Sequence, residues 1–375
     1  MKPRIIILRG HQVNPWELGP WEELGHDFDV RYLATRSGWF DASALSLPPI
    51  AAPALRDLLP RGRIGDMAVR IPGDRHLGLA KRLEGAAVVH SQELGYWYSN
   101  QAAALKRRLG FKLVLTVWET IPFRNTYRNA RTRPYRRRVL SQTDLFLAAT
   151  ERAQAALLLE GAPKDRVWVT PPGVDLERFR TAAGNRATAE GPMILSPGRL
   201  VWEKGHQDVL RALAALRSGL VRGAPVPRLV IAGQGPDRKR LGLYAKDLGV
   251  EDLVDFRRFV PYDEMPALFA AASCVVLASL PQCHWEEQFG MVLAEAMAAG
   301  TTICATTSGA IPEVVGESAS LFAPGDWLGL ARLLATGPLA RPPAESPGYP
   351  DEMTTRYSNS AAAERLAAAY DHVLD

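Results

Sequence analysis

The sequence predicts an α/β protein made of two doubly wound domains, and three observations support this prediction. The chain has 375 residues, which is too long for one ordinary core and suits two domains of about 150–200 residues. Short apolar runs alternate with helical stretches, as in parallel sheets whose two faces are covered by helices. This alternation stops in a polar stretch near the middle of the chain and then starts again. We therefore expect two Rossmann-like domains rather than one long sheet.

Six strands are expected in the first half of the chain, with helices between them. Each strand is apolar almost throughout, as buried parallel strands are. They are expected at Ile5–Leu8, Phe28–Leu33, Ala87–His90, Leu113–Val117, Leu145–Ala148 and Val167–Thr170. Helices are expected at Ser99–Leu109 and Glu151–Leu159.

The same pattern restarts in the second half of the chain. Strands are expected at Met193–Ser196, Leu229–Ala232, Cys274–Ala278 and Thr302–Ala305. Helices are expected at Gln207–Leu216, Arg238–Leu248 and Val292–Ala299.

Domain boundaries are expected where the alternation breaks. Gly173–Pro192 is polar and irregular, so we place the first domain at residues 1–180 and the second at 190–355. Another irregular stretch, Gly337–Asp351, precedes an amphipathic helix expected at Ala361–Leu374. Two Rossmann-like domains predict a ligand cleft outside the carboxyl ends of their strands.

The composition excludes several classes of protein. A content of 47% hydrophobic and 23% charged residues is that of a globular chain, not of a disordered or fibrous one. No apolar run approaches the roughly 18–20 residues of a membrane-spanning helix, and Ile5–Leu8 is too short for a signal-peptide core. Three cysteines, Cys274, Cys283 and Cys304, are too few for a disulfide framework. We expect a cytoplasmic protein.

The positive charge is concentrated in the first half of the chain. Residues 1–180 hold 28 Lys and Arg against 18 Asp and Glu, whereas the rest holds 17 against 22. Residues 101–138 alone carry eleven basic side chains and one acid, Glu119. A solvated face is one interpretation, and attraction of an anionic acceptor or an anionic membrane surface is the other. No nucleic-acid-binding motif accompanies this charge, so we expect no nucleic-acid partner.

The segment from Glu287 to Glu295 follows an expected strand and opens an expected helix. Gly290 lets the backbone approach a ligand closely, and the N–H groups of a first helical turn can hold phosphate oxygens. Glu287 can accept hydrogen bonds from sugar hydroxyls, and Glu295, eight residues later, can bind a diol such as a ribose. The alternative is that two acids decorate the helix, one of them favourably placed against its dipole.

A second segment, Ser196–Gly205, also runs from a strand into a helix. Arg199 offers a planar fork of donors and Lys204 a compact charge, a usual combination for binding a diphosphate. Neutralising a leaving diphosphate is the electrostatic task of a transferase that uses nucleotide-activated substrates. The alternative is two solvated cations in a loop.

Four segments occur in one order, namely Ser196–Gly205, Gly233–Pro236, Glu287–Gly300 and Gly309–Glu313. This ordered set resembles the retaining glycosyltransferases of family 4, which carry a Glu-x7-Glu motif. That family has the GT-B fold, in which two Rossmann-like domains face a cleft. The resemblance is close over residues 195–375.

The resemblance extends more loosely over residues 85–180. Pro172-Gly173-Val174-Asp175 with Phe179 is similar to the family's interdomain segment. The tail Tyr357–Leu374 is similar to its closing helix, which implies that residues 356–375 pack back on the first domain.

The resemblance also implies roles for single residues. Arg199 and Lys204 would bind the donor diphosphate and stabilise it as it leaves, Glu287 would contact the donor sugar, and Glu295 the ribose. Other donor-binding positions would be Gly198, Phe259, Val260, Phe289, Gly290, Met291 and Val292. The family needs no metal ion and no cofactor beyond its nucleotide-diphosphate sugar. Its mechanism is usually described as front-face, with the departing phosphate taking the acceptor's proton.

This sequence departs from the family pattern at the acceptor side. The family commonly has a histidine after the strand expected at Leu113–Val117, where this chain reads Trp118 and Glu119. We take Trp118, Glu119 and the strand-end His90 as acceptor-side candidates, although His90 is also explained as a structural residue. The family's N-terminal glycine pair is absent, and Gly19 is the residue that can serve in its place.

We therefore expect a retaining, metal-independent glycosyltransferase that moves a hexose-type sugar from a nucleotide-diphosphate donor. UDP is the nucleotide that we expect first, and GDP is the second choice. The acceptor is expected to be anionic or lipid-linked, with peripheral contact to the inner membrane face through the region Arg124–Arg138. Three alternatives stay open: another sugar-nucleotide enzyme such as an epimerase, a non-catalytic sugar-nucleotide-binding subunit, and a nicotinamide-dependent oxidoreductase. The last is disfavoured because Gly233-Gln234-Gly235 lacks the third glycine of a dinucleotide fingerprint.

Overall fold

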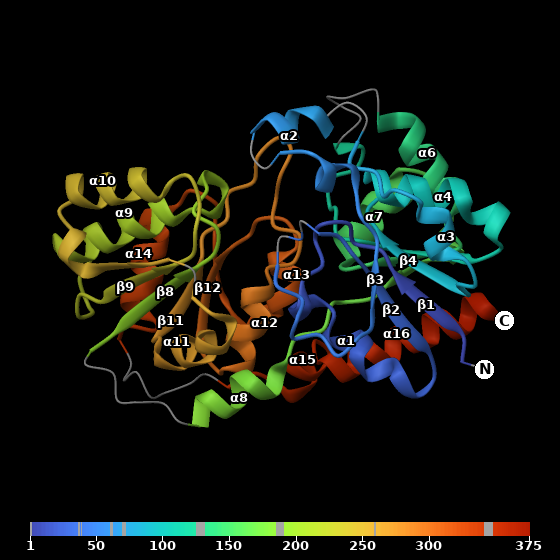
Figure 1. Cartoon of the computed structure of the whole chain (residues 1–375). Coiled ribbons are helices and arrows are strands. Elements are labelled where there is room, and N and C mark those ends of the chain that lie inside the picture. Colours follow the sequence, from blue (N-terminus) through green and yellow to red (C-terminus); the bar gives the residue numbers. More distant parts are fainter. Residues whose placement is uncertain are drawn as a thin grey trace. The chain divides into compact units, whose positions relative to one another are not determined.

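The computed structural model describes residues 2–36, 38, 40–60, 63–69, 73–124, 132–184, 191–258, 260–340 and 348–375. The chain divides into two compact units, which we describe separately (Figure 1). Unit 1 comprises Met1–Val174 and Ser358–Asp375, and unit 2 comprises Asp175–Tyr357. Residues 175–180, which we expected in the first domain, thus belong to unit 2.

Unit 1 contains a seven-stranded parallel sheet in the order β3-β2-β1-β4-β5-β6-β7. Its strands are β1 (Arg4–Ile7), β2 (Asp29–Ala34), β3 (Pro49–Ala51), β4 (Val88–Gln92), β5 (Lys112–Val117), β6 (Leu145–Ala148) and β7 (Val167–Val169). The six predicted strands are confirmed within two residues of their expected ends, and β3 was not predicted.

The helices of unit 1 cover both faces of this sheet. They are α1 (Gly19–Glu22), α2 (Arg63–Val69), α3 (Leu79–Leu83), α4 (Trp97–Leu109), α6 (Arg133–Gln142), α7 (Glu151–Leu159) and α16 (Asn359–Leu374). Short 3-10 helices are η1 (Pro15–Glu17), η2 (Glu23–His26), η3 (Leu55–Leu58) and η5 (Lys164–Arg166). Alternating residues of β1 enter two separate cores, Ile6 with the helices α3, α4, α6 and α7, and Ile7 with α1, η2 and α16. The central strand β1 is therefore buried on both faces, which explains the apolar run Ile5–Leu8.

Unit 2 contains a six-stranded parallel sheet in the order β10-β9-β8-β11-β12-β13. Its strands are β8 (Met193–Pro197), β9 (Arg228–Ala232), β10 (Val254–Arg257), β11 (Cys274–Leu277), β12 (Thr302–Thr306) and β13 (Ser320–Phe322). The four predicted strands are present, and the two edge strands β10 and β13 were not predicted.

One core of unit 2 joins the sheet to α9 (His206–Arg217), α10 (Arg238–Asp247) and α14 (Trp327–Thr336). The remaining helices are α8 (Leu176–Gly184), α11 (Met265–Ala271), α12 (Met291–Ala298), α13 (Ile311–Val315) and α15 (Asp351–Thr355). Its 3-10 helices are η6 (Trp202–Lys204), η7 (Glu251–Leu253), η8 (Tyr262–Glu264) and η9 (Gly316–Ser318). The stretch Gly173–Pro192, expected to be irregular, thus contains α8, which packs against α11 and α12.

The C-terminal helix α16 is an integral part of unit 1. Its N-cap Ser358 accepts a hydrogen bond from the Ala361 amide, which fixes where the helix starts. The face that carries Leu366 and Tyr370 is buried in the core shared with α1 and β1. Within the described part of the chain, no helix is both long enough and apolar enough to cross a bilayer.

Candidate functional site

Most of the described residues that the sequence singled out in unit 2 lie in the segments that follow β8 and β11. Gly198 and Gly233 follow β8 and β9, and a Cβ on Gly233 would lie 1.9 Å from the Gly198 carbonyl oxygen. The two strand-end loops therefore approach each other more closely than any side chain at Gly233 allows. The side chain of Arg199 is exposed and forms no ion pair with any residue that the structure describes. It is thus available to a ligand.

Lys204 and Glu287 form the central ion pair of this region. The Lys204 Nζ donates to Glu287 Oε2 at 2.6 Å, and the two side chains are only 14% and 8% exposed. Lys204 Nζ also lies 5.1 Å from the ring centroid of Trp285. The fold therefore brings together two side chains that are 83 positions apart in the sequence.

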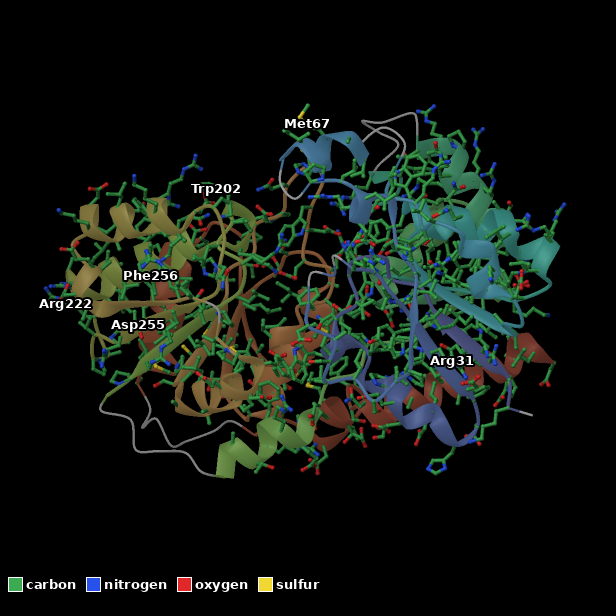
Figure 2. All side chains as sticks on the ribbon, viewed as in Figure 1. Arg31, Met67, Trp202, Arg222, Asp255 and Phe256 are labelled. Atoms are coloured by element: carbon green, nitrogen blue, oxygen red, sulfur yellow. The ribbon has the colours of Figure 1, made fainter. Side chains whose placement is uncertain are left out.

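Glycines hold both halves of this ion pair in place. Gly205 ends η6 with φ +70°, and a Cβ there would lie 1.8 Å from the Ala278 carbonyl oxygen at the end of β11. Gly309 has φ +58°, and a Cβ there would lie 2.0 Å from the Glu287 carbonyl oxygen. Both positions require glycine for the backbone conformation and for the close approach. The adjacent Trp202 is exposed on the surface of unit 2 (Figure 2).

The Glu287 carboxylate has a second donor. Ser279 Oγ donates to the same Oε2 atom at 2.7 Å, and the Ala310 amide donates to the Glu287 carbonyl at 2.9 Å. The carboxylate is therefore oriented by a cation and a hydroxyl, and it keeps lone pairs for hydroxyl donors of a ligand.

The helix α12 begins directly after Gly290, which has φ +80° and offers no side-chain cap to the first turn. Met291 and Val292 are half-buried there. The Phe289 side chain is buried against the Tyr357 ring, with centroids 5.3 Å apart, so its backbone is the part that can meet a ligand. An uncapped N-terminus of this kind favours an anion.

Glu295 lies inside α12 as a buried carboxyl group. Tyr262 donates its hydroxyl to Glu295 Oε1 at 3.1 Å, and burial raises the pKa of Glu295 to about 7. The guanidinium of Arg178 lies over the Tyr262 ring at 5.3 Å. Val260 is half-buried near this end of the unit, whereas Phe259 lies outside the described residues.

The buried His206 supports the Arg199 loop and was not identified from the sequence. Its Nε2 lies 3.1 Å from the Arg199 carbonyl oxygen, and its Nδ1 lies 2.8 Å from Ser196 Oγ. Burial lowers the pKa of His206 to about 4, so the ring is neutral at pH 7. Nε2 faces a carbonyl and must carry the proton, which leaves Nδ1 to accept from Ser196. A histidine that directly follows the Lys-Gly pair was the available sequence signal.

In unit 1, the structure places His90 in the core. Its Nδ1 lies 2.6 Å from the Tyr370 hydroxyl and its Nε2 lies 2.7 Å from Thr116 Oγ1. Trp21 Nε1 donates to the same Tyr370 hydroxyl at 2.7 Å. Burial lowers the pKa of His90 well below its usual value. Both ring nitrogens are occupied, so His90 has no nitrogen left for an acceptor.

Trp118 and Glu119 follow β5 and depend on a residue that the sequence did not reveal. Glu93 has φ +60°, and its Oε1 accepts from the Trp118 amide at 2.8 Å and from the Glu119 amide at 3.3 Å. Burial raises the pKa of Glu93 to about 7. Glu119 in turn pairs with Arg124 and accepts from the Ile121 amide at 3.1 Å.

Gly19 starts α1 and packs tightly within unit 1. A Cβ at this position would lie 2.5 Å from the Asn359 Nδ2 atom of α16. The packing of α1 against α16 therefore explains why a glycine is needed at this position.

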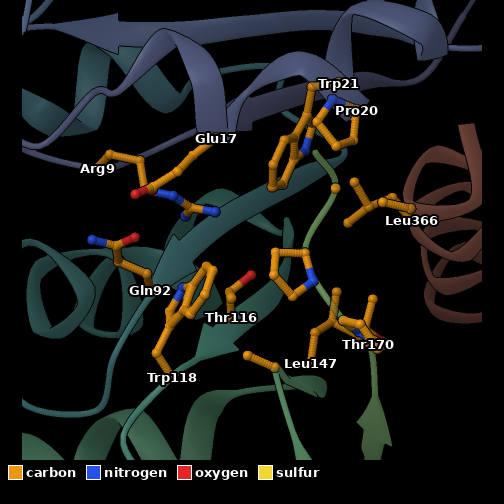
Figure 3. A pocket seen from close by; sticks show the side chains of 15 residues that line it. Arg9, Glu17, Pro20, Trp21, Gln92, Thr116, Trp118, Leu147, Thr170 and Leu366 are labelled. Atoms are coloured by element: carbon orange, nitrogen blue, oxygen red, sulfur yellow. The ribbon is translucent and has the colours of Figure 1, made fainter. Parts of the chain in front are cut away.

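A pocket opens at the carboxyl ends of β1, β4, β5, β6 and β7 in unit 1 (Figure 3). It is lined by Arg9, Glu17, Pro20, Trp21, Gln92, Thr116, Trp118, Leu147, Ala149, Thr170, Pro171, Pro172, Gly173, Ala362 and Leu366. Trp118 is the acceptor-side candidate that contributes to this lining, whereas His90 and Glu119 do not.

The basic stretch is divided between structural and exposed arginines. Arg136 is buried in an ion pair with Glu160, and Arg124 pairs with Glu119, so neither belongs to an open cationic face. The exposed members on α6 are Arg133, Arg137 and Arg138. Two further predicted members, Arg128 and Arg131, lie outside the described residues.

Sequence models of two families match the chain. The glycosyl transferases group 1 model matches residues 178–336, and the glycosyltransferase family 4 model matches residues 21–178. A D-inositol 3-phosphate glycosyltransferase of Corynebacterium jeikeium is 31% identical over 78% of this chain and 74% of its own. A GDP-mannose-dependent phosphatidylinositol monomannoside mannosyltransferase of Mycobacterium tuberculosis is 34% identical over 48% of each chain. Other curated relatives, from Salinispora, Acidothermus and Frankia, are longer, and this chain spans 55–64% of their length.

Solved structures resemble the whole chain at low sequence identity. Anabaena HepE in complex with UDP has a TM-score of 0.76 at 18% identity, covering 99% of this chain and 100% of its own. A sucrose-phosphate synthase from Thermosynechococcus elongatus has a TM-score of 0.75 at 18% identity, covering 99% of each chain. At this identity the likeness shows the fold alone.

Proposed function

Because this chain belongs to the glycosyltransferase family that the group 1 and family 4 sequence models describe, we propose that it transfers a hexose-type sugar from a nucleoside diphosphate donor. The predicted fold class, GT-B with two Rossmann-like domains, is confirmed. The observation that carries the proposal is the buried ion pair of Lys204 and Glu287 at the carboxyl ends of the unit 2 strands.

The donor diphosphate is proposed to bind Lys204 and Arg199. Lys204 supplies a compact charge that Trp285 and Glu287 already hold in place, and Arg199 supplies an exposed fork of N–H donors. The uncapped amides that follow Gly290 supply further donors to the phosphate. These groups neutralise the charge that grows on the leaving diphosphate without a metal ion.

The donor sugar and ribose are proposed to meet the two glutamates. Glu287 accepts hydrogen bonds from sugar hydroxyls with the lone pairs that Lys204 and Ser279 leave unused. Glu295, which Tyr262 orients, accepts from the ribose diol. The base is proposed to lie against the backbone at Phe259–Val260.

Transfer is proposed to proceed with retention of the anomeric configuration. The bond between the anomeric carbon and the phosphate oxygen breaks, and an acceptor hydroxyl oxygen bonds to that carbon on the same face. Its proton goes to the phosphate oxygen that has just left, so no separate protein base is needed. The occupied nitrogens of His90 agree with such a step.

We propose UDP as the nucleotide and GDP as the alternative. The fold neighbour HepE was solved with UDP and with UDP-glucose, which supports the first. The mycobacterial relatives are GDP-mannose-dependent, which supports the second.

We propose that unit 1 contacts an anionic membrane at its cytoplasmic face through Arg133, Arg137 and Arg138. Exposed basic side chains gain about 1 kcal/mol each near such a surface. Sedimentation with vesicles that contain phosphatidylserine should carry the protein down, and vesicles of phosphatidylcholine alone should not. Equal sedimentation with both would contradict this contact.

The experiment that tests the reaction follows UDP-glucose, UDP-galactose and GDP-mannose by proton NMR with octyl glycosides as acceptors and EDTA present. One donor should yield its free nucleoside diphosphate together with an α-linked product. An inverted linkage would contradict retention, and nucleoside diphosphate released with an epimerised free sugar would indicate an epimerase. The absence of any product from every donor would contradict a transferase and favour the non-catalytic subunit.

A further inference from the structure

The pocket of unit 1 contains one nearly buried cation whose hydrogen-bonding capacity is mostly unused. Arg9 is 3% exposed and lies directly after β1. Its Nη1 donates to the His90 carbonyl at 3.3 Å, and its guanidinium lies 5.4 Å from the Trp21 ring centroid. Arginine is almost never fully buried unless it is paired. Figure 3 shows the guanidinium pointing into the interior of the pocket.

The same pocket contains one carboxyl group. Glu17 lies at the end of η1, and Asn14 Nδ2 donates to its Oε1 at 3.3 Å. Glu17 and Arg9 influence each other electrostatically but form no ion pair among the described residues. Burial raises the pKa of Glu17 and lowers the pKa of Arg9. Each charged form is therefore short of partners that a ligand can provide.

Among the lining residues that the structure describes, Arg9 is the one cation and Glu17 the one anion. A phosphate or carboxylate on a ligand would gain Arg9 but would face Glu17. A hydroxylated ring meets both requirements, because its hydroxyl oxygens accept from the guanidinium and its O–H groups donate to the carboxylate.

The rest of the lining fits the body of such a ring. Trp118 and Trp21 present aromatic surface, and Pro171 and Leu366 present aliphatic surface. The C–H face of a saccharide or cyclic polyol packs against surface of this kind. Gln92 also lines the pocket: its amide nitrogen donates to Gln12 Oε1 at 2.9 Å, and its carbonyl oxygen is a further acceptor.

We propose that this pocket binds the acceptor through an uncharged, hydroxylated ring, held by Arg9 and Glu17 and packed on Trp118. This inference rests on the proposed function and names the acceptor class for it. It separates this chain from relatives named for inositol 3-phosphate, since a ring phosphate that reached Arg9 would also meet the Glu17 carboxylate.

The test is saturation-transfer NMR on the full chain with named probes. The neutral probes are methyl α-D-mannoside, methyl β-D-glucoside and myo-inositol, and the charged probe is glucose 6-phosphate. UDP and GDP, in separate samples, report on unit 2. At least one neutral ring should receive saturation, and glucose 6-phosphate should receive less. Glycosides and inositol together distinguish a saccharide from a cyclic polyol.

Variants connect the signal to the pocket. Glu17→Gln should weaken binding of the neutral ring about tenfold, the scale of one hydrogen bond to a charged group. Trp118→Leu should weaken it as well, and Arg108→Gln on the exposed side of α4 is the matched control. All three variants should keep the wild-type melting temperature within a few degrees, which excludes unfolding as the cause.

Three results would overturn the proposal: stronger saturation of glucose 6-phosphate than of any neutral ring, no saturated ring in a sample where UDP is saturated, or neutral-ring binding unchanged by Glu17→Gln and Trp118→Leu. A saturated neutral ring without any signal from UDP or GDP would support the pocket and contradict the proposed donor site. The two proposals thus fail separately.

Discussion

Replacing Lys204 with Met removes one partner of the central ion pair and keeps most of the aliphatic stem. Glu287 then remains 8% exposed with a single side-chain donor, Ser279 Oγ at 2.7 Å. At 2.6 Å and an effective dielectric constant of about 20, the attraction is roughly 6 kcal/mol before desolvation. Losing one partner of a buried pair typically costs about 3–5 kcal/mol. Because the Ser279 hydroxyl remains, we expect a loss of about 2–4 kcal/mol in the free energy of unfolding.

A double-mutant cycle in urea, followed by tryptophan fluorescence, isolates the pair from other effects. Glu287→Gln alone should also destabilise, because it leaves the ammonium without its carboxylate, whereas the double variant should lose much less than the sum. The coupling energy should be at least about 2 kcal/mol. Effects of the two single changes that add within about 0.5 kcal/mol would refute the pairing on which the donor site depends. Activity should fall about 10²–10³-fold in each single variant.

Three further perturbations follow from the structure. Glu295→Gln should raise the melting temperature by a few degrees at pH 8 and not at pH 5. The native pKa of Glu295, about 7, lies above its ordinary value of 4.5. The free energy of unfolding of the wild type therefore falls by on the order of 3 kcal/mol as the pH rises from the lower value to the higher one. An equal effect at both pH values would contradict a buried, protonated carboxyl. Gly309→Ala should lower the free energy of unfolding by several kcal/mol and abolish activity, because the new Cβ would lie 2.0 Å from a backbone oxygen. Gly249, with φ +64°, has open space around it, so Gly249→Ala should cost only about 1 kcal/mol in the same thermal melts. Similar losses in the two variants would contradict this, because they would show that positive-φ backbone strain, and not the steric contact of the new Cβ, sets the cost at both sites. Arg136→Ala should cost about 3–5 kcal/mol in urea unfolding, since it leaves a buried carboxylate unpaired, and the exposed Arg137→Ala should cost less than about 0.5 kcal/mol yet weaken vesicle binding. The opposite order of stabilities would contradict the assigned burial.

Apart from the edge strand β7, the strands that the sequence predicted lie in the interior of their sheets. A run such as Leu145–Ala148 is wholly apolar because helices cover both sides of β6, so composition alone reveals it. The missed strands are short edge strands whose exposed sides carry other residues. β3 begins with a proline, and β10 contains Asp255 and Arg257.

The site was predicted unevenly for a related reason. Lys204 and Glu287 stand in local sequence motifs, so spacing and resemblance point to each of them. No local sequence pattern marks Glu93, because its carboxylate accepts from two amides that follow the neighbouring strand β5. Arg9 did leave a signal, a cation directly after four aliphatic residues, but its significance appears only when the pocket around it is known.

The acceptor side shows how a strand-end residue can mislead. His90 ends a predicted strand, which is where ligands bind in such sheets. The hydroxyl of Tyr370, contributed by a helix 280 residues further along the chain, takes one of its nitrogens. No local pattern predicts a partner at that separation.

The most direct test of the donor site is isothermal titration calorimetry of the full chain with UDP, GDP, ADP and NAD in EDTA. We predict that one nucleoside diphosphate, UDP before GDP, binds at one site per chain. Lys204→Met and Glu295→Gln should each weaken that binding about tenfold or more, and Arg108→Gln should leave it unchanged. Binding of NAD alone would favour an oxidoreductase. Binding of no nucleotide, or equal affinity in all variants, would contradict the donor site in unit 2.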